Sequence, residues 1–164
     1  FIQYPITAVG ESWLLDRLPV PDEALVWLLL KKGVEEFQYD GESVKALRAA
    51  TDTYFESNIA ASRRLGEFTV DANQVFEMVL AVGHIGHINP NHAGLLLLFF
   101  NVIRRDINAD EIMHITPAAE DAKERFPFLL KGADDDDRSV HDLKGFFRAL
   151  YMAWSMNLPL RIDA

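Results

Sequence analysis

Cysteine is absent from the 164 residues of this chain. Its absence excludes disulfides, thiolate nucleophiles and every zinc site that uses cysteine ligands. A cysteine-free composition is normal in the cytosol and is also tolerated outside it. From the composition we expect a cytoplasmic protein.

Positive charge is scarce. The chain has 16 basic and 25 acidic residues, which gives a formal net charge of −9 with histidine neutral. Such a chain repels phosphate backbones at long range, so nucleic-acid binding is not favoured. We expect an acidic surface.

Long hydrophobic runs are also missing. The longest are ALVWLLL at 24–30 and AGLLLLFF at 93–100, whereas a membrane-spanning helix needs about 20 apolar residues. The sequence therefore predicts no membrane span, and it predicts that these runs form buried core or interface helices.

Helix signals dominate what is present. Pro21 precedes an apolar run that Gly33 can stop, and a second periodic segment runs from after Gly41 to Gly66. The stretch 92–105 is apolar almost all round, which is typical of a buried helix. Only 67–70 and the opening residues 1–9 are candidate strands, and both are short.

Helix starts are indicated by a capping residue followed three positions later by an acid or amide. This pattern occurs as Asp71 with Gln74, as Asn108 with Glu111 and as Ser139 with Asp142. Thr116, followed by Pro117, is a further candidate cap.

Together these patterns predict an all-α fold. We expect a compact single-domain bundle of about six or seven helices over residues 1–164, with a buried central helix near 92–105. The chain can be a whole protein or part of a longer one.

A histidine-rich stretch, VGHIGHINPNHAG, is the main hint of chemistry. His84, His87 and His92 follow the pattern H-x2-H-x4-H, and Glu111 with His114 adds Glu-x-x-His spacing. Neutral imidazole is the commonest protein ligand for metals, so these five residues are a candidate zinc or iron site.

The same stretch also has a structural interpretation. Gly83 and Gly86 permit a helix to end, Pro90 restrains Asn89, and Asn91 can cap the next helix. The letters HIGH at 84–87 also resemble an ATP-binding motif of class I aminoacyl-tRNA synthetases. However, a helical pattern precedes them and no KMSKS-like segment occurs, so we interpret the stretch as a corner.

The end of the chain is the candidate partner-binding segment. An amphipathic stripe over 140–154 leads into ALYMAWSMNLPL, which contains Tyr151, Trp154, Met156 and Leu158. Core packing is the default interpretation of such residues, but methionine and aromatic side chains are also enriched at protein interfaces.

Two functional hypotheses follow. No Gly-x-Ser-x-Gly, Walker or dinucleotide-binding signature occurs. The sequence therefore favours a non-enzymatic helical interaction domain: an adaptor, chaperone-like or assembly component that binds another protein or itself and needs no cofactor. It should expose a contiguous apolar patch. The alternative is a metal-dependent enzyme built on His84, His87 and His92.

Overall fold

The structure is a computed structural model that describes residues 2–81, 86–115 and 120–162. It is mostly helical, with 51% helix and 9% strand. The described residues form these α-helices: α1 (Ala8–Asp16), α2 (Ala24–Glu36), α3 (Glu42–Ala50), α4 (Ala72–Phe76), α5 (Pro90–Phe99), α6 (Ala109–His114), α7 (Ala122–Arg125) and α8 (Arg138–Ser155).

A π-helical turn, η1 (Glu77–Ala81), continues α4. Strands β1 (Ser62–Leu65) and β2 (Phe68–Asp71) form one antiparallel pair, and β3 (His87–Ile88) and β4 (Leu160–Arg161) form another. The mostly helical content is thus confirmed, whereas the two small sheets depart from an all-α class; β2 overlaps the candidate strand at 67–70. None of the helices in the described ranges is long and apolar enough to cross a membrane.

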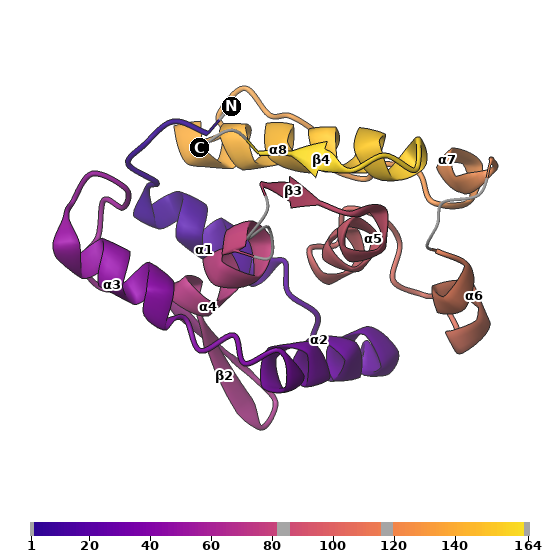
Figure 1. Ribbon diagram of the computed structural model, residues 1–164, viewed down its shortest axis with the longest axis horizontal. Helices are drawn as coiled ribbons and strands as arrows, with labels where there is room; N and C mark the ends of the chain where they lie inside the picture. Colours follow the sequence, from indigo (N-terminus) through magenta and orange to yellow (C-terminus); the bar gives the residue numbers. More distant parts are fainter. Residues whose placement is uncertain (1, 82–85, 116–119, 163–164) are drawn as a thin grey trace.

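The helices surround α5 (Figure 1). The longest helix, α8, lies along one side of the molecule, α2 and α3 lie along the opposite side, and α1, α4 and α5 lie between them. Leu96, Leu97 and Leu98 of α5 have no exposed surface. This matches the predicted central helix, because apolar side chains around the whole circumference can be accommodated only in the interior.

The central helix is shorter than predicted. It ends at Phe99, and Asn101 adopts a left-handed φ of 52°. The N–H groups of Asn101 and Val102 then donate to Leu98 and Leu97, the bonding pattern of a Schellman motif. Buried Arg105 also donates to the carbonyls of Leu98 and Phe99, so the carbonyls at this buried helix end have partners.

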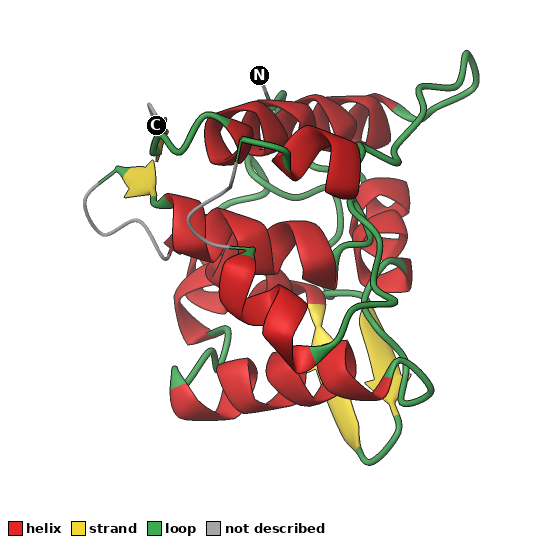
Figure 2. Ribbon diagram, turned by 90° about the vertical axis from the view of Figure 1, so that its right-hand side faces the viewer, coloured by secondary structure: helices red, strands yellow, loops and turns green. Residues whose placement is uncertain are grey.

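The predicted helix from Gly41 to Gly66 is wrong in its second half. The helix ends at Ala50, and residues 62–71 form the β1–β2 hairpin, which lies at the end of the molecule farthest from α8 (Figure 2). Gly66 has a φ of 61° at the first position of a two-residue turn, where a hairpin needs glycine. Its missing side chain also makes room, because a Cβ there would lie 2.9 Å from Pro21 Cγ.

Two of the predicted capping boxes are confirmed. Asp71 with Gln74 and Asn108 with Glu111 each exchange both hydrogen bonds. Thr116 and Pro117 lie outside the described residues.

Two predicted caps are wrong. Helix α8 is capped by Asp137 and not by Ser139, whose hydroxyl instead accepts from the Thr7 N–H at 2.9 Å. Helix α5 is capped by Asn89 and not by Asn91, because proline fits the first helical position and moves the cap to the residue before it.

Candidate functional site

The five candidate metal ligands are not brought together in the described part of the chain. His84 lies outside it, His87 is in β3, and His92 is in the first turn of α5. Glu111 and His114 lie on α6, away from β3 in Figure 1. Among the described residues no group of three or more histidine or acidic side chains could hold a metal ion.

Local bonds explain the positions of the described members. Glu111 completes its capping box and forms an ion pair with Arg104. His114 Nδ1 lies 2.7 Å from the Asp110 carbonyl oxygen, one turn back in α6. His92 Nε2 lies 3.4 Å from the Met78 carbonyl oxygen, and burial lowers the pKa of His92. Partial burial therefore favours the neutral ring.

The candidate partner-binding residues divide into two pairs. Trp154 has no exposed surface and Tyr151 only 6%. Trp154 Nε1 donates to the Ile115 carbonyl and the Tyr151 hydroxyl to the Phe126 carbonyl, both at 2.8 Å. These two residues hold α8 in the fold and offer no surface to a partner. Met156 and Leu158 are 53% and 52% exposed and remain candidates.

The outer face of α8 extends this exposed pair. Met152, which is 40% exposed, lies one turn before Met156 on the same side of the helix. The small residues Gly145 and Ala149 continue this exposed face toward the start of α8. Three large apolar side chains are thus exposed within residues 152–158. We refer to Arg148, Met152, Met156, Leu158 and Arg161 as the α8 surface.

Local bonds fix the geometry of this surface. After α8 ends, Asn157 has a left-handed φ of 55°, and the N–H groups of Asn157 and Leu158 donate to Trp154 and Ala153. This Schellman motif fixes the position of Leu158. The guanidinium of Arg148 lies 5.5 Å from the centre of the Phe128 ring, a cation–π contact that restrains this side chain.

The charge of this region is opposite to that of the chain. From Arg138 to Ile162 the sole acidic residue is Asp142, which is only 8% exposed, whereas Arg138, Arg148 and Arg161 are exposed. Across the molecule, the end of α2 and the start of α3 expose several acids: Glu35, Glu36, Asp40 and Glu42. The acidic surface that composition predicts is therefore unevenly distributed.

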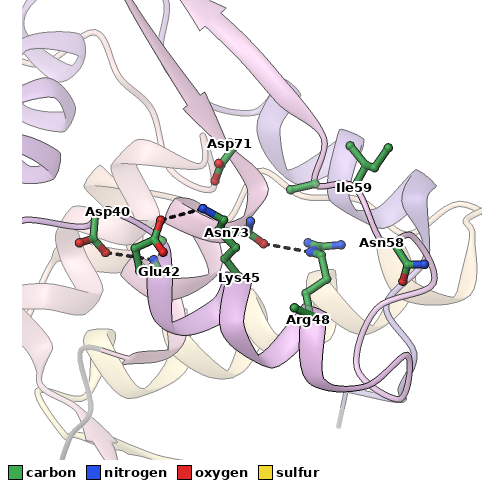
Figure 3. A pocket seen from close by; sticks show the side chains of 11 residues that line it. Asp40, Glu42, Lys45, Arg48, Asn58, Ile59, Asp71 and Asn73 are labelled. Atoms are coloured by element: carbon green, nitrogen blue, oxygen red, sulfur yellow. Dashed lines mark hydrogen bonds and ion pairs between the residues drawn. The ribbon is translucent and has the colours of Figure 1, made fainter.

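A pocket of about 660 Å³ lies on the acidic side, between α3, the start of α4 and residues 58–60 (Figure 3). Its wall includes Arg48, which forms a buried ion pair with Glu11 of α1. The sequence analysis did not predict this ion pair, although the position of Glu11 in its helix indicates a buried acid. Glu11 lies three and four residues before Leu14 and Leu15, on the apolar face of its helix.

The chain was compared with protein families, curated proteins and solved structures, and none of them matches it.

Proposed function

We propose that this chain is a non-enzymatic protein-interaction domain whose α8 surface binds an acidic, partly apolar segment of a partner protein. The observation that carries the proposal is the combination of exposed methionine, leucine and arginine on α8 and in the residues directly after it, in a chain with a net charge of −9. Methionine and arginine are both enriched in the core of protein interfaces.

The apolar part of the α8 surface supplies contact area. Met152, Met156 and Leu158 are each about half exposed, so a partner would remove much apolar surface from water. Burial of apolar surface stabilises a complex by about 25 cal/mol per Å² before the costs of association. The flexible thioethers can adapt to partners of different shape.

The charged part selects the partner. Arg148 precedes and Arg161 follows the apolar side chains along the chain, and no exposed acid lies within residues 138–162 to neutralise them. An acidic partner segment is attracted here, whereas a basic one is repelled. A polyphosphate backbone would meet the same arginines, but the net charge of −9 opposes its approach. A protein carboxylate is therefore the favoured counterpart.

Helix α8 is a rigid platform for such binding. Phe147, Leu150 and Trp154 anchor its inner face and have no exposed surface. A partner would not have to order this helix, which reduces the entropic cost of association.

The test uses two synthetic amphipathic helices of equal length, one with leucine and glutamate and one with leucine and lysine in place of glutamate. We expect fluorescence anisotropy to show that the acidic peptide binds at least tenfold more tightly than the basic one. The double variant Arg148→Glu, Arg161→Glu should weaken acidic-peptide binding at least tenfold. Equal affinity of both peptides would contradict the charge argument.

The matched control reverses two charges elsewhere. Lys32 on α2 and Arg64 on β1 are exposed and lie on the side opposite α8, so Lys32→Glu, Arg64→Glu should leave the affinity within twofold of the parent. A second variant, Met152→Gln, Met156→Gln, removes apolar contact without changing charge and should also weaken binding. If it has no effect, the interaction is not made at this surface.

A further inference from the structure

Arg48 in the pocket of Figure 3 has an incomplete set of hydrogen bonds. Its side chain is 3% exposed, and its Nη1 group donates to Glu11 Oε1 and to the Ser57 carbonyl, both at 2.7 Å. Its Nε group donates to Asn73 Oδ1 at 3.0 Å. Nη2 is buried and has no hydrogen-bond partner.

An unpartnered nitrogen of this kind is unusual. A buried donor without an acceptor costs about 1 to 3 kcal/mol, and more when the donor is charged. Native proteins therefore satisfy most buried donors with a protein group, a water or a ligand. The guanidinium is also fixed in place, because its Cζ lies 3.9 Å from the centre of the Phe55 ring. Nη2 is thus a positioned donor that lacks an acceptor.

The guanidinium group of Arg48 is directed toward the pocket. In Figure 3 it lies between the side chains of Asn73 and Asn58, with Ile59 on the same side. Asn58 and Ile59 line the pocket and are exposed, Ile59 by 83%. A ligand oxygen would reach Nη2 from this side once these two exposed side chains rotate aside.

The rest of the pocket is acidic. Asp40, Glu42 and Asp71, here called the acidic rim, contribute three carboxylates to the lining. The lining also contains the cation Lys45, whose Nζ lies 3.0 Å from Glu42 Oε1. The hydrogen bond that Lys45 donates to the Glu42 carboxylate raises the pKa of Lys45, so the lysine remains a cation. Glu11 already neutralises Arg48, and the lining therefore has an excess of negative charge.

The unpaired Arg48 donor and the acidic rim together favour some classes of ligand over others. A phosphate or a simple carboxylate would find one donor at Arg48 but would be repelled by the acidic rim. A simple amine would match the rim but would leave Nη2 without an acceptor. A molecule that carries both a carboxylate and an ammonium group matches Nη2 of Arg48 with the first and the acidic rim with the second.

We propose that this pocket binds a small zwitterion of the amino-acid type. Its carboxylate accepts from Nη2 of Arg48, and its ammonium group lies against the acidic rim. The pocket is on the side of the molecule opposite α8, so this binding is independent of partner docking at the α8 surface.

Four probes of similar size test the proposal by isothermal titration calorimetry at pH 7 and low salt. They are L-norleucine, 6-aminohexanoate, hexanoate and hexylamine. We expect at least one of the two zwitterions to bind saturably and at least tenfold more tightly than hexanoate and hexylamine. The proposal is overturned if neither zwitterion binds, or if hexylamine or hexanoate binds as well as the better zwitterion.

Variants locate the binding. Arg48→Lys keeps a positive charge beside Glu11 but lacks Nη2, and it should weaken zwitterion binding at least tenfold in a sample shown to be folded by circular dichroism. Asn58→Leu, at the exposed mouth, should block the pocket without touching the ion pair. The matched control Asn91→Leu, an exposed asparagine on α5, should leave the affinity unchanged. Parental affinity in both Arg48→Lys and Asn58→Leu would refute the assignment.

Discussion

Removing one partner of the buried ion pair between Glu11 and Arg48 should cost far more stability than removing one partner of an exposed pair. The side chains of Glu11 and Arg48 are 1% and 3% exposed, and the Glu11 carboxylate also accepts from the Ala61 N–H at 3.3 Å. Glu11→Gln keeps the shape of the side chain but removes its charge. Arg48 then remains charged in the interior, and removing one partner of such a pair costs about 3 to 5 kcal/mol.

A matched comparison is available in the same region. The pair Lys45–Glu42 has a similar length of 3.0 Å, but both side chains are 64% exposed. Glu42→Gln removes the same charge in water, where an exposed pair contributes at most about 1 kcal/mol. The two variants therefore separate the effect of burial from the effect of the contact itself.

Urea unfolding followed by tryptophan fluorescence measures both costs. With a urea dependence of about 2 kcal/mol per M, the Glu11 variant should lower the unfolding midpoint by roughly 1.5 to 2.5 M and the Glu42 variant by no more than about 0.5 M. Equal shifts would refute the assignment of a buried charge pair. The variant Glu11→Leu, Arg48→Met should recover most of the loss, because replacing both charges removes the desolvation cost.

Three further predictions concern the fold. Asn89→Ala should cost about 1 kcal/mol of unfolding free energy, whereas Asn91→Ala should change it by less than about 0.5 kcal/mol; chemical denaturation distinguishes the two possible caps of α5. Trp154→Phe should cost about 2 kcal/mol in the same assay, because the Ile115 carbonyl loses its donor, and an unchanged stability would contradict the hydrogen bond. Because burial lowers the pKa of His92, protonation favours the unfolded chain, and stability should fall as the pH drops below about 6.5. Thermal unfolding at pH 7 and pH 5 should show a smaller fall for His92→Gln than for the parent, and an equal fall would assign the acid sensitivity to other groups.

Local signals predicted the helix starts where the cap and its bonding partner are neighbours. The boxes at Asp71 and Asn108 are complete within four residues, so no distant contact is needed to form them. The predicted cap of α8 was wrong because a distant residue takes part. Ser139 has a suitable side chain, but Thr7 at the other end of the chain uses its hydroxyl, and Asp137 caps the helix.

The candidate site was predicted only in part. Met156 and Leu158 are exposed as a partner surface requires, whereas Tyr151 and Trp154 are buried by elements that lie 25 to 39 residues away. The pocket could not be predicted, because Arg48 and Glu11 come from different helices and Asn73 from a third. Each is an ordinary polar residue in the sequence.

Local sequence patterns were enough to predict the mostly helical fold and the burial of α5. Helix periodicity and capping act over three or four residues, and a helix that is apolar all round has no stable position except the interior. The candidate strand at 67–70 located one strand of the hairpin, whereas only the packing of the whole chain shows that Arg48 and Glu11 meet inside the fold and that basic residues collect outside α8 in an acidic chain. These features depend on which segments pack together, and residues distant in sequence carry no local pattern that specifies their contact.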